Sequence, residues 1–294
     1  MSDYFIATAS TSDLSLAYVE AHNIPFISYT FEIDGKVYQD DLTPESRQFL
    51  YTSMRNNKQP HTAAVSMFAY HEFFKELMET GKDVIYVDMC RALSSSIGNC
   101  EAAMKQIRKE FPHQRITFLD SYCVTGGLGL LVKQLVKKHE EGCSFDEVVD
   151  WGEQHKMEYI HRFMVNDLQW LRKGGRLSNA SAIVGSLLSI KPIIYVDLEG
   201  KLVSTSTVRG RKKCLKALLE SMAEDINETT ALEEITVISA DDEEDCKAFA
   251  EAIRSTYPSL RDAEITITVL GPVIASHVGP DFVGLTYHGK RRIM

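Results

Sequence analysis

The sequence predicts a two-domain α/β protein, with a largely parallel sheet in the N-terminal domain and a mixed sheet in the C-terminal domain. Over the first half, apolar strand patterns alternate with helical patterns of ten or more residues, which favours parallel β-α-β units covered on both faces. In the second half, the Glu199-Gly200 turn joins two strand patterns and indicates a mixed sheet. A chain of 294 residues suits two ordinary domains. We place them at residues 1–158 and 159–294.

The elements of the first half follow from local signals. Asp13 is available to cap the first helix, Asp34-Gly35 is a hairpin signal, Pro44 suits the first position of a helix, and Ser144 with Glu147 forms a capping box. The predicted strands lie at 4–9, 24–29, 31–38 (interrupted by the hairpin turn), 83–89 and 115–119. The predicted helices lie at 14–22, from 44, from 67, at 98–110, after Gly126-Gly127 to about 141, and from 145.

The second half opens with a distinctive segment that runs from Phe163 to Ser178 and continues from Leu187 to Ile194. It predicts a short strand, a helix closed by Gly174-Gly175, a second helix, and a strand entered through Lys191-Pro192. Two adjacent glycines suit a left-handed helix exit and a close backbone approach, and Arg176 can then pair with an acid or a helix end. Further strands are predicted at 193–196, 202–208, 235–239, 265–270 and 283–287, with helices from 211 and after 241.

Composition excludes several classes of protein. The formal net charge is −9, which argues against a nucleic-acid-binding protein, because such proteins gain affinity by neutralising phosphates. The six cysteines are scattered singly, which is typical of reduced thiols in a cytoplasmic protein and not of a disulfide framework or zinc site. We see no secretion signal and no apolar stretch of the roughly 20 residues that a membrane span needs. We therefore expect a soluble cytoplasmic protein without a metal or cofactor.

Three residues are candidates for binding an anionic group. Thr62 lies in a predicted loop before a helix and could donate to a ligand or cap that helix. Ser94 begins a run of three serines after an apolar strand, at the carboxyl end where ligands bind in open α/β sheets, although capping alone could explain it. His277 lies in a loop punctuated by glycine and proline, where it could be a base, a ligand or a structural residue.

Other motifs carry weaker signals. Arg209 leads a basic cluster at a helix start, a location that the helix dipole disfavours, so the cluster is either a solvated face or a docking site for an acidic partner. Asp120-Ser121 before Gly126-Gly127 resembles a phosphate loop, but Val132 stands in place of the third glycine of the dinucleotide motif. The usual motifs of ATPases, esterases and zinc proteases are absent.

Several segments, in order, resemble the DegV family, whose members bind fatty acids. The resemblance spans essentially the whole chain. The matching segments are Ala7 to Leu14, Pro60 to Ser66, Ala92 to Ser96, Asp120-Ser121, Gly126 to Leu130, Phe163 to Ser178, Val208-Arg209 and Ser276 to Pro280. The chain departs from the family pattern at Ala9, where an aspartate is usual, and at Ala63, where a serine is usual.

The resemblance implies a long-chain fatty acid bound between the two domains, with its carboxylate at Thr62, Ser94 and His277. Ser95, Ser96, Ser121 and Arg176 are additional candidate ligand contacts. The resemblance also implies a separate ATP-dependent fatty-acid kinase that converts the bound acid to an acyl phosphate for phospholipid synthesis, with Arg209 at a docking position, and it allows transient membrane contact. The chain itself would then be a carrier and not an enzyme.

Two alternatives remain open at this point. A hydrolase of a small acyl or phosphoryl substrate would use Ser94 as nucleophile and His277 as base, but the sequence shows neither a nucleophile elbow nor an orienting acid. In a regulatory or structural protein, lipid would only complete the fold.

Overall fold

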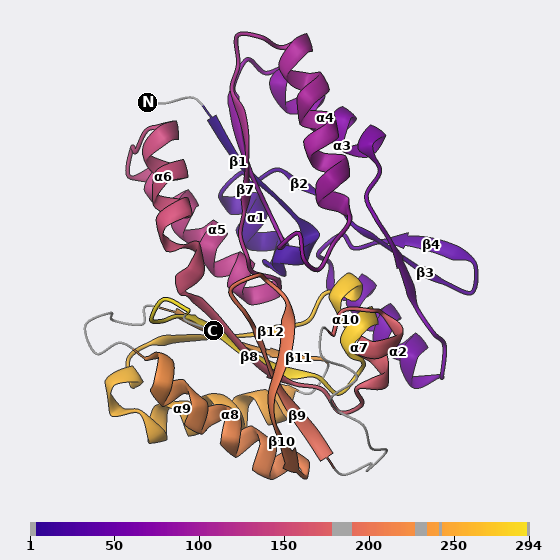
Figure 1. The fold of residues 1–294 in the computed structure, drawn as a ribbon, viewed down its shortest axis with the longest axis vertical. Coiled ribbons are helices and arrows are strands. Elements are labelled where there is room, and N and C mark those ends of the chain that lie inside the picture. The colour runs from indigo at the N-terminus through magenta and orange to yellow at the C-terminus, as the bar shows by residue number, and fades with distance from the viewer. Residues whose placement is uncertain (1–3, 178–189, 227–233, 241–242, 293–294) are drawn as a thin grey trace.

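A computed structural model describes residues 4–177, 190–226, 234–240 and 243–292. The helix predicted between Gly174-Gly175 and Leu187 lies outside these ranges. Figure 1 shows two sheets, one above the other, with helices on their outer faces and between them. None of the helices in the described ranges combines the length and the apolar character that crossing a membrane requires.

The N-terminal sheet is parallel, as predicted. Its strand order is β2-β1-β6-β7, with β1 at Tyr4–Ala9, β2 at Phe26–Ile27, β6 at Asp83–Asp88 and β7 at Ile116–Asp120. The helices α3 (Met67–Met78) and α4 (Ser96–Glu110) pack together on one face, and α5 (Thr125–Glu140) and α6 (Phe145–His155) lie on the other (Figure 1). The carboxyl ends of these strands point toward the second sheet.

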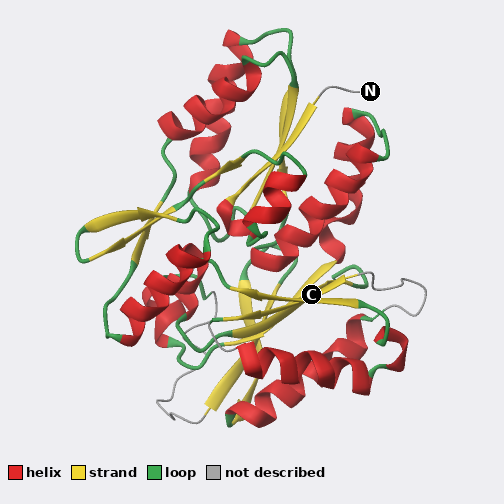
Figure 2. Cartoon of the chain, turned by 180° about the vertical axis from the view of Figure 1, so that it is seen from behind, coloured by secondary structure: helices red, strands yellow, loops and turns green. Residues whose placement is uncertain are grey.

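The C-terminal sheet is mixed, also as predicted. Its order is β10-β9-β8-β13-β11-β12, and among the described residues only β11 and β12 of this sheet pair in parallel. The strands are β8 Tyr159–Met164, β9 Ile190–Val196, β10 Leu202–Arg209, β11 Glu234–Ser239, β12 Glu264–Val269 and β13 Val283–His288. The helices α8 (Arg211–Asp225) and α9 (Glu243–Thr256) cover its outer face, while α5 contacts its inner face (Figure 2). The domain boundary at residue 158 stays a prediction.

A third, small sheet projects beside the interface between the two larger ones. It has the order β4-β3-β5, with β3 at Thr30–Ile33, β4 at Lys36–Gln39 and β5 at His61–Ala63. The hairpin signal is confirmed: Asp34 and Gly35 both have positive φ between β3 and β4. The strand β5 was not predicted, and its pairing places Thr62 opposite Phe31. Nearby are α2 (Pro44–Arg55), α7 (Gln169–Lys173) and α10 (Pro272–Val278).

The predicted role of Asp13 as a helix cap is wrong. The first helix, α1 (Leu16–Ala21), begins later, and the Ser15 side chain caps it by accepting the Tyr18 N–H. Asp13 is buried in a left-handed conformation, and its carboxylate accepts the N–H of Gly271 at the start of α10. A buried carboxylate needs such a donor, which ties it to a helix distant in sequence.

The position expected for Gly126-Gly127, ahead of a helix, is also corrected: both glycines lie within the first turn of α5. A Cβ on Gly126 would stand 2.7 Å from Thr286 Oγ1, and one on Gly127 would stand 2.2 Å from His161 Nε2. These glycines therefore allow α5 to approach the inner face of the C-terminal sheet. Close packing, and not helix capping, explains them.

Candidate binding cavity

A largely apolar cavity lies between the two large sheets. Its unfilled space, with the opening to solvent included, is ≈ 840 Å³. Val124, Ile238, Leu285 and Phe282 are buried residues of its wall. Ala63, Ala64 and Ser95 are wall residues exposed to solvent, so they mark the mouth. The buried wall is largely apolar, but it also includes the polar residues Thr125, His161 and Thr286.

Thr62 and His277 meet at this cavity. Their Oγ1 and Nε2 atoms are 2.9 Å apart and share a hydrogen bond across 215 residues of sequence. Thr62 is on β5, and His277 is on the last turn of α10, so the prediction that both lie in loops is wrong. Pro272 at the first turn and Gly279, with φ of 89°, at the end define this short helix, which explains why the sequence resembled a loop.

His277 is held as a neutral imidazole. Burial, together with the smaller effect of the positive charge of Arg176, lowers its pKa to about 4. The ring can approach the chain here because residue 174 is glycine: a Cβ at that position would lie 2.4 Å from His277 Nδ1. Gly174 itself has ordinary helical angles, whereas Gly175 has a φ of 68°. Gly174 thus provides the predicted close approach, and Gly175 provides the predicted left-handed exit from the helix.

Ser94, Ser95 and Arg176 also line the cavity. Ser94 Oγ accepts the N–H of Ser96 near the start of α4, and a serine hydroxyl that accepts one hydrogen bond can also donate one. The Arg176 guanidinium donates to the carbonyl oxygens of Leu93 and Gly174, the latter at the end of α7. Of the two partners expected for Arg176, an acid or a helix end, the structure thus shows the helix end. This contact fixes a positive charge close to both Ser94 and His277.

Ser96 and Ser121 do not line the cavity. Ser96 Oγ accepts the N–H of Val65, and Ser121 Oγ makes hydrogen bonds within its own turn to Cys123. Arg209 is exposed at the far end of β10, seven residues beyond the cavity residue Leu202, or about 23 Å along an ideal strand. Ala63 lies at the mouth, and Ala9 is buried outside the wall.

Sequence reasoning missed a buried network around Asp88 beneath the Ser94 loop. Its carboxylate accepts hydrogen bonds from the hydroxyls of Tyr29, Tyr70 and Tyr86, and also from Thr11 Oγ1 and the Met89 N–H. Burial raises the pKa of Asp88, and these donors lower it. Tyr29 also lines the cavity. Apart from the position of Asp88 at the end of an apolar strand, no feature of the sequence indicates that three tyrosines converge there.

The arrangement does not favour nucleophilic catalysis. A serine nucleophile needs a base within hydrogen-bond reach and an acid that orients the base. Nε2 of His277 is hydrogen-bonded to Thr62, and no carboxylate partner of His277 is found among the described residues. A pKa of about 4 also makes this imidazole a weak base at neutral pH. The site instead offers hydroxyl groups, a neutral imidazole and a guanidinium at the mouth of an apolar cavity.

Such a cavity defines a class of protein that binds small amphipathic molecules, with the polar end of the ligand at the mouth. Comparison with known proteins identifies the family. A family model described as an uncharacterised protein of the DegV family matches residues 4–290, and the chain belongs to the DegV family. A DegV domain-containing protein of Clostridium perfringens is 33% identical over 296 residues, covering 99% of each chain.

Solved structures share the fold. A fatty acid binding DegV family protein from Streptococcus agalactiae has a TM-score of 0.85 and 26% identity, covering 99% of this chain and 100% of its own. The fatty acid kinase B3 protein of Streptococcus pneumoniae, loaded with linoleic acid, has a TM-score of 0.81 and 23% identity, covering 98% and 99%. The predicted family and fold class are therefore confirmed.

Proposed function

We propose that this protein is a cytoplasmic carrier of a long-chain fatty acid and presents the acid to a separate ATP-dependent fatty-acid kinase. The observation that carries the proposal is that Thr62, Ser94 and His277 all line one largely apolar cavity, in which Thr62 and His277 are hydrogen-bonded to each other. The family membership and the fatty acid binding named for the relative from Streptococcus agalactiae support it. The cysteines are all free thiols, which suits a reducing compartment.

The polar mouth matches a carboxylate. A buried carboxylate is costly unless donors surround it. If the ligand replaces the hydrogen bond between Thr62 and His277, Thr62 and Ser94 would donate through their hydroxyls and His277 through its Nε2–H, while Arg176 supplies a fixed positive charge that needs no proton uptake. Hydrogen bonds to a charged group contribute about 1.5–3 kcal/mol each. The head group would therefore be oriented by several donors from four separate segments of the chain.

The apolar interior matches an acyl tail. Each methylene removed from water contributes about 0.8 kcal/mol, so a dozen supply on the order of 10 kcal/mol before the costs of association. The tail would thus dominate the affinity, and the head group would set the orientation. Ala63 stands where the family usually has a serine, so one hydroxyl is missing at the mouth. Ser94 and Thr62 are then the hydroxyl donors proposed for the carboxylate.

Substitution of the hydroxyls tests the head-group assignment. We expect Ser94→Ala and Thr62→Val each to weaken fatty-acid binding by about 10- to 150-fold, which corresponds to the loss of one hydrogen bond to a charged group. Ser121→Ala removes a hydroxyl outside the cavity and is the matched control, with unchanged affinity. Titration calorimetry of delipidated protein with stearate measures these values. Wild-type affinity in both cavity variants would reject the assignment.

The kinase role rests on the resemblance and on the exposure of Arg209. In this proposal the kinase contacts a surface at the end of β10, away from the cavity mouth. We expect Arg209→Glu to leave fatty-acid binding unchanged and to slow acyl-phosphate formation by a fatty-acid kinase that accepts fatty acid from DegV carriers. Arg261→Glu is the matched control, because Arg261 is exposed beyond α9, next to β12 at the opposite edge of the same sheet. Equal rates for the two variants would remove Arg209 from the docking surface.

A further inference from the structure

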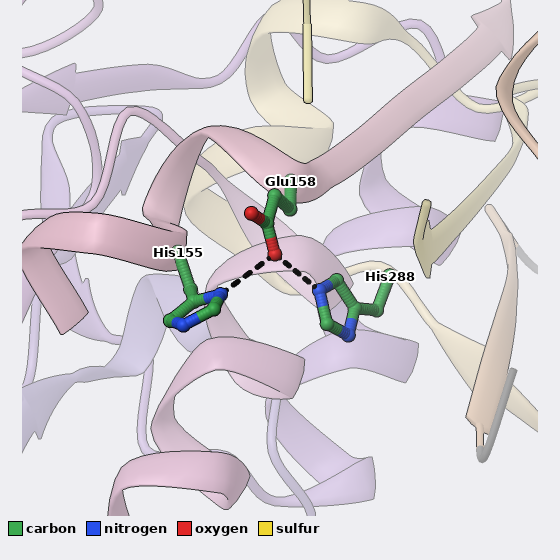
Figure 3. A group of neighbouring side chains, drawn as sticks. All are labelled: His155, Glu158 and His288. Carbon is green, nitrogen blue, oxygen red and sulfur yellow. Dashed lines mark hydrogen bonds and ion pairs between the residues drawn. The ribbon is translucent and has the colours of Figure 1, made fainter. Parts of the chain in front are cut away.

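A cluster of two histidines and one glutamate lies away from the cavity, where the two large sheets are joined. His155 is the last residue of α6, Glu158 ends the short 3-10 segment η2 (Lys156–Glu158), and His288 is the last residue of β13. Figure 3 shows both imidazole rings directed at the carboxylate from opposite sides. Glu158 Oε2 is 2.8 Å from His155 Nδ1 and 2.8 Å from His288 Nε2.

Local structure brings these side chains together. His155 and Glu158 are three residues apart at the end of a helix, a spacing that places side chains side by side. The register of β8 and β13 puts His288 opposite Tyr159, next to Glu158. The N–H of Gly289 donates to the Glu158 carbonyl oxygen at 2.8 Å and fixes the chain beside it. The third side chain is therefore positioned by backbone pairing that does not depend on the cluster.

Aromatic neighbours limit how the two imidazoles can move. The His155 ring stacks on Trp151, with centroids 4.5 Å apart and planes inclined by 23°. The His288 ring stacks on Tyr159, with centroids 5.1 Å apart and planes inclined by 16°. The three side chains are between 23% and 33% exposed, so solvent can reach the group. Held rings with access to water are features of a metal site that retains an open coordination position.

We propose that His155, Glu158 and His288 bind a divalent transition-metal ion of the zinc type, through Nδ1, a carboxylate oxygen and Nε2 respectively. These three ligand atoms lie within 4.8 Å of one another. Tetrahedral zinc ligands at about 2.1 Å from the ion stand roughly 3.4 Å apart. Binding thus requires the two nitrogens to approach by up to about 1.4 Å and each nitrogen–oxygen distance to widen slightly. Side-chain rotation of partly exposed residues can supply this movement.

The ligand types select the ion. Imidazole nitrogen with one carboxylate suits zinc and its neighbours, whereas Mg²⁺ and Ca²⁺ prefer oxygen ligands. With Glu158 ionised, each imidazole carries its hydrogen on the nitrogen that faces Oε2. The metal ion takes these two positions, and the hydrogens move to the outward ring nitrogens by exchange with water.

A bound ion would connect α6, which packs on the N-terminal sheet, to the end of β13 in the C-terminal sheet. Since the ion binds the folded chain, it should raise the thermal midpoint of unfolding. Sequence analysis predicted no metal because the cysteines are scattered and no H-E-x-x-H motif is present. The pattern here is a histidine and a glutamate three residues apart, with the third residue 130 positions further along, which no short motif would reveal.

Titration calorimetry of the full chain with ZnCl₂, after treatment with a chelator and desalting, tests the proposal. We expect one Zn²⁺ per chain and no binding of Mg²⁺. His155→Gln and His288→Gln keep a hydrogen-bonding side chain, and each should weaken zinc binding by at least about 100-fold, because loss of groups outside the ligands alone costs about 10- to 100-fold. The thermal midpoint, measured with and without Zn²⁺, should rise only when all three ligands are present.

His71→Gln is the matched control. His71 also contacts two carboxylates, but it uses its two ring nitrogens for Glu72 and Glu110 separately, so these groups cannot converge on one ion. This variant should bind zinc like the wild type. Absence of zinc binding in the wild type, unchanged binding in the His155 and His288 variants, or an equal loss in His71→Gln would each overturn the proposal and leave the cluster as a hydrogen-bonded group only.

Discussion

The substitution Gly174→Ala probes the head-group site through a single added methyl group. Gly174 ends α7 with φ of −72° and ψ of −12°, angles that alanine adopts without strain. The new Cβ would stand 2.4 Å from His277 Nδ1 and 3.4 Å from two carbon atoms of the same ring. The imidazole must therefore move, and its hydrogen bond with Thr62 at the cavity mouth must lengthen or break.

The expected magnitude follows from this lost contact. If the displaced imidazole no longer donates to the carboxylate, one hydrogen bond to a charged group is removed, which costs about 1.5–3 kcal/mol. Fatty-acid affinity should then fall by about 10- to 150-fold. Gly175→Ala is the matched control: its Cβ meets nothing within 4 Å, but φ is +68°, so it should cost about 1–2 kcal/mol of stability and leave affinity unchanged.

Titration of delipidated wild type and both variants with stearate measures the affinities, and urea unfolding measures the stabilities. The reasoning predicts that the two effects separate, with lost affinity in Gly174→Ala and lost stability in Gly175→Ala. Wild-type affinity in Gly174→Ala would refute it, because the imidazole would then play no part in holding the ligand. Equal loss of affinity in both variants would point to the general conformation of this turn instead.

Two further predictions concern stability. Burial raises the pKa of Asp13 to about 8. Between about pH 4 and pH 8 the folded chain therefore binds more protons than the unfolded chain, and its stability falls as pH rises. Asp13→Asn should make the free energy of unfolding in urea less dependent on pH over this range, and an unchanged dependence would contradict the assignment. Gly127→Ala places a Cβ 2.2 Å from His161 Nε2 and should lower the free energy of unfolding by about 1–3 kcal/mol. Gly98→Ala, whose Cβ on α4 meets no atom within 4 Å, should raise it by up to about 1 kcal/mol. A smaller loss of stability in Gly127→Ala than in Gly98→Ala would contradict the packing argument.

Local signals in the sequence predicted much of the fold. Asp34-Gly35 makes the expected hairpin turn, and Ser144 with Glu147 forms the expected capping box. These features depend only on residues a few positions apart, so a short stretch of sequence is enough to predict them. The β-strand at Thr62 and the helix at His277 were missed because each is short and is stabilised by distant partners: β5 pairs with β3, and Gly271, the N-cap of α10, donates its N–H to Asp13.

The candidate site was predictable only in part. Thr62, Ser94 and His277 were singled out from the sequence and the family resemblance, and all three line one cavity. The contribution of Gly174, the neutral state of His277 and the Asp88 network depend on tertiary contacts that no spacing along the chain encodes. Ser96 and Ser121 matched the pattern of hydroxyls near strand ends, but their hydroxyls serve the local backbone.

The measurement that tests the central claim most directly is mass spectrometry of the protein as purified, first under native conditions and then after denaturation and solvent extraction. The account predicts one fatty acid per chain, released on denaturation and reduced in the Ser94→Ala variant. A chain that carries no fatty acid and takes up none when stearate is added would contradict the account.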